Sequence, residues 1–466
     1  MNMESPNTSG IRQLFVTLLL FVVISMGFQA LSLHFGYKRH LFSAELLASF
    51  VLISVGMKRL GAAVLVVAVI LEIMLGMASI FILFEAVQVV DMAGFLFQAR
   101  AEYLWGFFLA LTLALVFTWM AARICTEKPS KKIYLLQLLV VVGLFQYQWV
   151  LSAEHNTFFS PTFAERKNLI FGSAMHFTRE AMHVNKGVVI GNGAEDAEYV
   201  PIKNASAART IWKDVPTSSR ILFIIAESWG FPRDQAVLES QIQSLRMSPR
   251  VNNLEVGGIH AIGATVAGEL REICGLIPTR LNFRKLTSEA VGECLPMLMA
   301  KKGYRTVGVH GANGVMYHRL QWWPEVGFSE LIFREALPLA VSDCHSFPGY
   351  CDRDLVEVVA QKLQNDKAFV YWLTLNSHVP YDRRDIAMYR EELCHGVFKE
   401  VYEEQLCNYQ NLHVQFFEGL SRLIDSENLK GLEVVVVGDH SPVFSNESSR
   451  AKFERTKVPM IHFYVN

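Results

Sequence analysis

Two apolar runs, far apart in the chain, each end in residues that bind metals. Ile221–Ala226 is followed at once by Glu227, and Val434–Val437 is followed, after one glycine, by Asp439 and His440. A short, continuous, β-branched run is typical of a buried strand in a parallel sheet. Ligands of open α/β sheets lie just beyond the carboxyl ends of such strands. We therefore predict that the two carboxylates and the imidazole converge on one cation, for which Zn²⁺ or Mn²⁺ is suitable. The alternative is a turn cap at Asp439 and an ion pair at Glu227.

A threonine could supply the reactive group of such a site. Thr265 follows Gly263 and Ala264 and precedes a predicted helix, Val266–Leu276. The free N–H groups and the dipole at a helix N-terminus favour a phosphoryl group. A metal that lowers the pKa of the threonine hydroxyl would make it a nucleophile near neutral pH. The alternative is that Thr265 only caps the helix.

Polar residues follow two more predicted strands. His378 could hold a phosphate oxygen or protonate a leaving group, or it could be an ordinary surface histidine. His310 and Asn313 follow the other strand, and Arg319 lies six residues further along. The guanidinium of Arg319 could bind a phosphate through paired hydrogen bonds, or it could form a structural salt bridge.

From Arg220 onward, strand-like runs alternate with helical patterns. This alternation predicts an α/β domain with a mostly parallel sheet flanked by helices. The predicted strands are Ile221–Ala226, Thr306–Val309, Phe369–Leu375, Val434–Val437 and Met460–Val465, and the predicted helices besides the one after Thr265 are Cys294–Lys302, Asp352–Leu363 and Val401–Ile424.

The N-terminal third is strongly apolar. The chain has 466 residues, of which 52% are hydrophobic, and a mean hydropathy of +0.26. We predict a transmembrane domain at residues 1–151, a connecting region at 152–215 and a catalytic domain at 216–466. In the connecting region, a helix near Ala164–Val184 is either interfacial or an ordinary linker helix. The second predicted span is short and contains Glu45. The five predicted spans are Leu14–Leu33, Leu41–Met57, Ala62–Phe84, Leu104–Ala122 and Ile133–Leu151.

Charges between the spans predict an orientation. Lys58-Arg59 and the basic residues between spans four and five indicate cytoplasmic loops, which places the N-terminus inside and the catalytic domain outside. Lys38-Arg39 favours the opposite orientation, which stays as an alternative. The net charge of −1 lacks the basic signature of a nucleic-acid-binding protein.

The cysteines agree with an exported domain. Of seven cysteines, six follow residue 152. An even number in an exported domain predicts disulfides, and six cysteines allow 15 pairings. Sequence proximity favours the pairs Cys274–Cys294, Cys344–Cys351 and Cys394–Cys407. The alternative is six free thiols in a cytosolic domain.

The order of these motifs resembles the sulfatase-like membrane phosphotransferases of the alkaline phosphatase superfamily. That group includes lipid A phosphoethanolamine transferases and lipoteichoic acid synthases. The resemblance rests on Glu after a strand, Gly-x-Thr, His-Gly followed by aromatic-x-Arg, Asn-Ser-His-x-Pro-Tyr and Gly-Asp-His, between Arg220 and Asn466.

The resemblance implies a role for each motif. Glu227, Thr265, Asp439 and His440 match the metal ligands, with Zn²⁺ first and Mn²⁺ or Mg²⁺ as alternatives. Thr265 also matches the residue that takes up the phosphoryl group, and His378 the residue on the substrate phosphate. The remaining substrate contacts are expected from His310, Asn313, Tyr317 and Arg319.

The implied activity is the transfer of phosphoethanolamine from phosphatidylethanolamine to a hydroxyl of an envelope glycan or glycolipid. It would proceed through a phosphothreonine at the periplasmic face of a bacterial inner membrane. The alternatives are phosphoglycerol transfer from phosphatidylglycerol, a membrane-tethered phosphatase or sulfatase, and an inactive scaffold. Ser441-Pro442 departs from the usual Gly-Glu of phosphoethanolamine transferases, and the spacing from Cys274 to Arg280 does not fit a true sulfatase.

Overall fold

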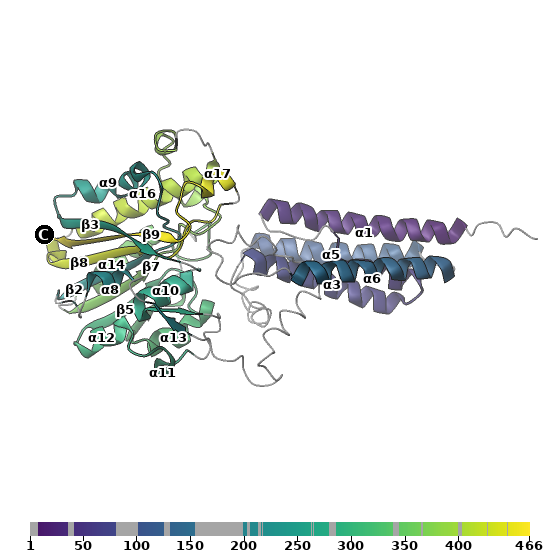
Figure 1. Ribbon diagram of the computed structural model, residues 1–466, viewed down its shortest axis with the longest axis horizontal. Helices are drawn as coiled ribbons and strands as arrows, with labels where there is room; N and C mark the ends of the chain where they lie inside the picture. The colour runs from purple at the N-terminus through teal and green to yellow at the C-terminus, as the bar shows by residue number, and fades with distance from the viewer. Residues whose placement is uncertain are drawn as a thin grey trace, which may run out of the picture. The chain divides into compact units, whose positions relative to one another are not determined.

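In the computed structural model the chain forms two compact units (Figure 1). One holds helices α1, α2, α3, α5 and α6, and the other holds the strands and helices from β1 onward. The structure describes residues 8–35, 42–80, 101–124, 131–153, 199–202, 206–212, 216, 218–261, 263, 265–278, 286–338, 344–364, 367–398, 403–425, 427–444 and 446–466.

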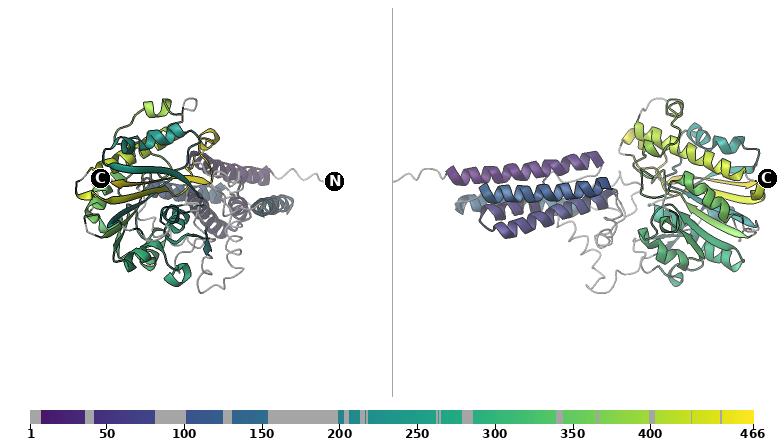
Figure 2. Two further views of the ribbon diagram at one scale, coloured as in Figure 1. Left: turned by 60° about the vertical axis from the view of Figure 1, so that its left-hand side comes forward. Right: turned by 180° about the vertical axis from the view of Figure 1, so that it is seen from behind.

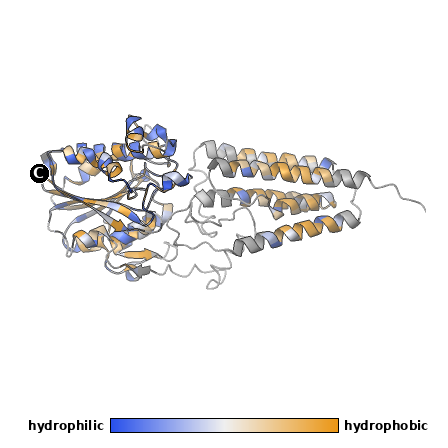
Figure 3. Ribbon diagram, turned by 45° about the horizontal axis from the view of Figure 1, so that its top comes forward, coloured by the Kyte–Doolittle hydropathy of each residue, from blue (hydrophilic) through white to orange (hydrophobic). Residues whose placement is uncertain are grey.

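The N-terminal unit is a bundle of apolar helices. Leu46, Phe50, Ile53 and Leu65 are among the side chains buried in its core, and Figure 3 shows hydrophobic residues along its helices. Its described helices are α1 (Thr8–Phe35), α2 (Ala44–Ser54), α3 (Lys58–Ile80), α5 (Ala101–Ile124) and α6 (Lys131–Ala153).

Within the described residues, one helix is long and apolar enough to cross a membrane, with its apolar window at Phe15–Ser32. The predicted second span is corrected, because α2 has 11 residues against the roughly 20 that a bilayer requires. The other three predicted spans coincide with α3, α5 and α6, apart from residues 81–84, which lie outside the described part. That these three cross a membrane stays a prediction. The predicted interfacial helix also lies outside the described residues.

The second unit is built on a seven-stranded sheet, in the order β3-β9-β8-β2-β7-β5-β6. Of these strands, β9 alone runs against the others, so the predicted mostly parallel α/β sheet is confirmed. Helices cover both faces of the sheet (Figures 1 and 2). The strands are β2 (Arg220–Ala226), β3 (Val251–His260), β5 (Arg305–His310), β6 (Glu330–Ile332), β7 (Ala368–Leu373), β8 (Leu432–Gly438) and β9 (Lys457–Val465).

Several smaller elements complete this unit. Strands β1 (Tyr199–Pro201) and β4 (Leu276–Pro278) form a separate antiparallel pair. The helices are α8 (Ala207–Ile211), α9 (Gln235–Met247), α10 (Thr265–Cys274), α11 (Ser288–Val291), α12 (Leu295–Lys301), α13 (Arg319–Glu325), α14 (Asp352–Lys362), α15 (Glu392–His395), α16 (Glu404–Ile424) and α17 (Glu447–Arg450).

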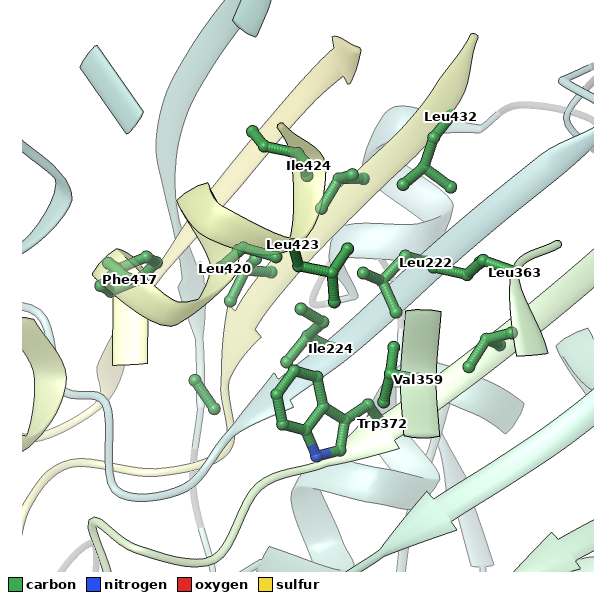
Figure 4. Close-up of a cluster of buried hydrophobic side chains, with 14 of the residues drawn as sticks. Leu222, Ile224, Val359, Leu363, Trp372, Phe417, Leu420, Leu423, Ile424 and Leu432 are labelled. Carbon is green, nitrogen blue, oxygen red and sulfur yellow. The ribbon is translucent and has the colours of Figure 1, made fainter. Parts of the chain in front are cut away.

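The core explains why the central strands read as continuous apolar runs. Leu222 and Ile224 of β2 pack with Trp372 of β7 and with Leu420 of α16 on one face (Figure 4). Phe223 points to the other face, where its ring stacks on Tyr371 at a centroid distance of 6.4 Å. Because both faces are covered, successive residues are all apolar.

All three predicted disulfides are confirmed. Cys274 pairs with Cys294, Cys344 with Cys351, and Cys394 with Cys407. The first joins the end of α10 to the start of α12. The second lies directly before α14, and the third joins α15 to α16.

Candidate active site

The strand register brings the predicted metal ligands together. In the parallel pair β2–β8, Ala226 is opposite Gly438, so the next residues, Glu227 and Asp439, leave the sheet side by side. Ligand atoms of Glu227, Asp439 and His440 all lie within 4.8 Å of one another, and all three residues are buried. Their role as metal ligands stays a prediction.

The donor atoms of this group fit a divalent cation. Asp439 Oδ1 accepts hydrogen bonds from the backbone N–H groups of Ser228 at 2.7 Å and His440 at 2.6 Å. Asp439 Oδ2 is buried and has no hydrogen-bond partner among the described residues. His440 Nδ1 lies 2.9 Å from Ser441 O, and Nε2 faces the carboxylates, 3.4 Å from Asp439 Oδ2 and 3.5 Å from Glu227 Oε1. A proton held at Nδ1 would leave Nε2 as the electron-pair donor to a cation bound there. A buried carboxylate oxygen that accepts no hydrogen bond is costly unless a cation binds it.

The charges of the three groups are interdependent when no cation is bound. Burial raises the pKa of Asp439 to about 8, and the negative charge of Glu227 adds to this effect. Burial opposes the charged form of Glu227, but the hydrogen bond from His440 and the charge of His378 hold its pKa well below the usual range. Burial likewise opposes protonation of His440, but the two carboxylates outweigh it and raise its pKa to about 9. Protons thus occupy the place that a cation would take.

Thr265 lies against this group. It is the first residue of α10, and its Oγ1 donates a hydrogen bond of 3.0 Å to Glu227 Oε2. Gly263 has a φ of +95°, a conformation that favours glycine and turns the chain into the helix. A Cβ atom on Gly268 would lie 2.8 Å from Asp439 Cβ. The glycine therefore allows α10 to approach the ligand-bearing end of β8.

The loop after β7 also holds Glu227. The backbone N–H of Glu227 donates to Thr374 Oγ1 at 2.9 Å, and Ser377 Oγ donates to the carbonyl of Glu227 at 2.7 Å. His378, the next residue, is half-buried against Phe347 at a ring-centroid distance of 4.8 Å. Its Nδ1 lies 2.6 Å from Val379 O, which leaves Nε2 for a substrate.

Sequence reasoning missed the acid that fixes this loop. Asp352, at the start of α14, accepts hydrogen bonds from the backbone N–H groups of Leu375 at 2.9 Å and Asn376 at 2.7 Å. In turn, Asn376 Oδ1 accepts a hydrogen bond from the backbone N–H of Asp352. An acid in the first turn of a predicted helix was the available signal, but it indicates only a favourable helix end.

Two of the predicted substrate contacts, His310 and Asn313, follow β5, and both form hydrogen bonds within the protein. His310 is buried at the end of β5, with Nδ1 3.0 Å from Leu373 O. Burial and the charge of Arg319 lower its pKa to about 3, so it is neutral. Asn313 Oδ1 accepts a hydrogen bond of 2.9 Å from the backbone N–H of Val315, which closes a local turn. Their contact with a substrate stays a prediction.

Arg319 forms the salt bridge that the sequence left open. Its NH2 and Nε donate to Glu269 Oε1 at 2.6 and 3.0 Å. Trp323 Nε1 donates to the other oxygen of Glu269 at 3.2 Å. The ring of Tyr317 lies 5.0 Å from the guanidinium carbon. The pair is buried, and a head-group role for Tyr317 and Arg319 stays a prediction. Glu269 was not predicted, because a charged residue inside a helix normally faces solvent.

The sheet order and the cluster at its edge define an α/β domain of the alkaline phosphatase type. Residues 285–464 match the model of the Sulfatase family. This match confirms the resemblance to the sulfatase and alkaline phosphatase superfamily seen in the motifs. The match indicates a sulfatase-family enzyme. No curated protein sequence matches the chain.

Several solved structures are similar to this chain at low sequence identity. An alkaline phosphatase superfamily protein from Vibrio parahaemolyticus is 18% identical, with 53% of this chain and 60% of that chain covered and a TM-score of 0.38. The lipoteichoic acid synthase LtaP from Listeria monocytogenes is 17% identical, with 61% and 71% covered and a TM-score of 0.40. The periplasmic domain of EcEptC from Escherichia coli, in complex with Zn, is 12% identical, with 58% and 76% covered and a TM-score of 0.38. The chain thus spans less than two thirds of the first, and none of these likenesses bears on its activity.

Proposed function

We propose that this protein is a metal-dependent membrane transferase. It moves phosphoethanolamine from phosphatidylethanolamine to a hydroxyl of an envelope glycan or glycolipid, through a covalent phosphodiester on Thr265. Its place would be a bacterial inner membrane, with the catalytic domain in the periplasm. One N-terminal helix that is apolar and long enough to cross a membrane is consistent with this place.

One observation carries the proposal. The hydroxyl of Thr265 lies at a helix N-terminus and contacts Glu227. Glu227 in turn adjoins Asp439 Oδ2, a buried oxygen that accepts no hydrogen bond among the described residues. A threonine that only capped α10 would donate to no buried carboxylate of another element. A nucleophile that adjoins a cation site and the N–H groups of a helix is suited to attack at phosphorus.

Glu227, Asp439 and His440 would hold the cation, with Thr265 as the fourth ligand. A bound Zn²⁺, or Mn²⁺ or Mg²⁺ in its place, would lower the pKa of the threonine hydroxyl and stabilise negative charge on phosphoryl oxygens. The chain itself supplies the orientation. The 3.0 Å hydrogen bond to Glu227 Oε2 fixes the direction of the Thr265 Oγ1 proton.

The first step forms the bond between Thr265 Oγ1 and phosphorus and breaks the bond between phosphorus and the diacylglycerol oxygen. The threonine loses its proton towards Glu227, and the leaving oxygen gains one from His378 Nε2. In the second step the acceptor hydroxyl gives its proton to His378 and attacks phosphorus. The bond to Thr265 breaks, and the threonine regains its proton. One site thus serves two substrates in turn.

Phosphatidylglycerol is the second candidate donor, and it would yield a phosphoglycerol transferase. The aromatic-x-Arg motif of Tyr317 and Arg319 favours it, because it resembles the lipoteichoic acid synthases. The three disulfides favour phosphatidylethanolamine, since the cysteine-rich domain resembles phosphoethanolamine transferases. Transfer to water, as in a phosphatase, would use the same first step.

The donor can be tested with the full chain reconstituted in vesicles of phosphatidylcholine that contain either phosphatidylethanolamine or phosphatidylglycerol. Release of diacylglycerol from the first set, lost in Thr265→Ala and much slower in His378→Gln, is the expected result. Release from the second set alone would assign the phosphoglycerol reaction instead. Release that persists in Thr265→Ala would contradict the proposed nucleophile.

A further inference from the structure

Arg271 binds the backbone of a predicted metal ligand. Its side chain is buried, and the guanidinium donates from NH1 to Asp439 O at 2.8 Å and from NH2 to Gly438 O at 2.7 Å. These carbonyls belong to the last residue of β8 and the residue after it. The carbonyl of Asp439 is part of the peptide bond to His440. One side chain therefore fixes the backbone on which both Asp439 and His440 stand.

The guanidinium is itself fixed from its other side. Arg271 Nε donates to Glu272 Oε1 at 2.7 Å. Glu272 Oε2 accepts hydrogen bonds from the backbone N–H of Ala207 at 2.7 Å and from Ser206 Oγ at 3.1 Å, at the start of α8. A guanidinium is a planar fork, so three hydrogen bonds to three fixed acceptors leave it little freedom.

Helix α10 connects this support to the nucleophile. Thr265 and Arg271 are six residues apart on one helix, which is less than two turns. Between them, Gly268 allows the helix backbone to contact Asp439. A rigid helix with Thr265 at its start and Arg271 near its end thus sets the distance between the nucleophile and two ligands.

We propose that Arg271 is a positioning residue for the metal site, which orients Asp439 and His440 through their backbone. The inference rests on the proposed metal-dependent function. Groups that orient metal ligands without touching the metal typically change metal affinity by roughly 10- to 100-fold when they are replaced.

The test uses the full chain in detergent, first freed of metal by a chelator. Zn²⁺ affinity is measured by competition with a chromophoric chelator for the unaltered protein, Arg271→Lys and Arg271→Met. The visible spectrum of the Co²⁺-loaded proteins reports the geometry of the ligands. Glu433→Gln is the matched control, because Glu433 is a buried carboxylate near the other end of β8 that binds Trp212 and His462.

The lysine can reach only one of the two carbonyls, while it keeps the charge opposite Glu272. We expect roughly tenfold weaker Zn²⁺ binding and an altered Co²⁺ spectrum in Arg271→Lys, a larger loss in Arg271→Met, and neither change in Glu433→Gln. If Arg271→Met fails to fold, Arg271→Lys decides. Unchanged affinity and spectrum in a folded Arg271→Lys would overturn the inference. An unaltered protein that binds neither ion would instead overturn the proposed function.

Discussion

Thr265 Oγ1 and Glu227 Oε2 lie 3.0 Å apart and share a hydrogen bond, although 38 residues separate them in the chain. The contact joins the first residue of α10 to the residue that follows β2. The proposed nucleophile and a predicted metal ligand are therefore in place before a cation or substrate binds. Such preorganisation removes the entropic cost of bringing the groups together during the reaction.

The close approach of α10 to Asp439 predicts that Gly268→Ala reduces turnover. The added Cβ would lie 2.8 Å from Asp439 Cβ and 2.9 Å from Asp439 Cα, so the helix or the ligand must shift. We expect about a 100-fold loss of diacylglycerol release, since a misplacement of about 1 Å can have such an effect.

Gly419→Ala, also within a helix, is the control for this change. Its Cβ would meet the nearest atom, of Val356, at an ordinary 3.7 Å. This variant should keep full turnover and gain slightly in stability, because alanine favours the helix. Equal turnover in the two variants would show that the approach of α10 to Asp439 does not matter.

The protons that Asp439 and His440 hold in the metal-free site predict that stability and metal affinity change with pH in opposite directions. The pKa of Asp439 rises from 3.8 to about 8 and that of His440 from 6.5 to about 9 on folding. A group whose pKa is raised on folding stabilises the fold fully at pH values below its unfolded pKa. This contribution is lost as the pH rises through its folded pKa. Glu227, whose pKa is lowered on folding, makes a constant contribution to stability at pH values above its unfolded pKa.

The free energy of unfolding of chelator-treated protein should therefore fall between about pH 4.5 and pH 9. Zn²⁺ affinity should rise over the same range, because Asp439 and His440 must lose their protons to bind a cation. Thermal unfolding with and without Zn²⁺ at several pH values measures both. A metal-free protein whose stability rises with pH across this range would contradict the assignment of these protons.

The buried pair of Glu269 and Arg319 predicts a large stability loss in Glu269→Gln. Removal of one partner leaves a buried charge without its counterion, which costs about 3–5 kcal/mol. Glu239→Gln, which breaks the exposed pair with Arg246, should cost about 0–1 kcal/mol. Urea unfolding of both variants gives the comparison, and similar losses would mean that the buried pair is not formed.

Two disulfides should differ in their effect on catalysis. Asn376 Nδ2 donates to Cys344 Sγ, and Ser346 Oγ donates to Asn376 O at 3.2 Å, so the Cys344–Cys351 loop supports the segment that carries His378. Replacing both of these cysteines with serine should lower both stability, by about 2–4 kcal/mol, and turnover.

The matched change at Cys394 and Cys407 should lower stability with little effect on turnover. Its disulfide joins α15 to α16 rather than supporting the loop of His378. Unfolding midpoints and diacylglycerol release are measured side by side. Equal loss of turnover in the two double variants would argue against a specific role for the Cys344–Cys351 loop.

The strand ends could be predicted because their signal is local. The β-branched runs before Glu227 and Asp439 indicate buried strands, and parallel strands bring their carboxyl ends to one edge. Strand β3 was missed because it lies at the sheet edge, where only Ile259 of its residues is buried. The apolar run of its antiparallel partner β9 predicted a strand there, but it did not predict that this strand runs antiparallel to the others.

The charges inside α10 could not be predicted. Glu269, Arg271 and Glu272 read as the polar face of a helix, yet all three are buried because each has a partner on another element. Arg319 showed the same ambiguity, since a guanidinium suits a phosphate and a carboxylate equally. Such partners depend on tertiary contacts between elements that are distant in the sequence.

The central claim is that Thr265 carries the transferred group. The most direct test is to incubate the full chain, without acceptor, with vesicles that contain phosphatidylethanolamine, and to locate the adduct by mass spectrometry of the digested protein. The proposal predicts phosphoethanolamine on the peptide that contains Thr265, and none after chelation of the metal. An adduct on another residue, or its persistence in Thr265→Ala, would contradict the claim.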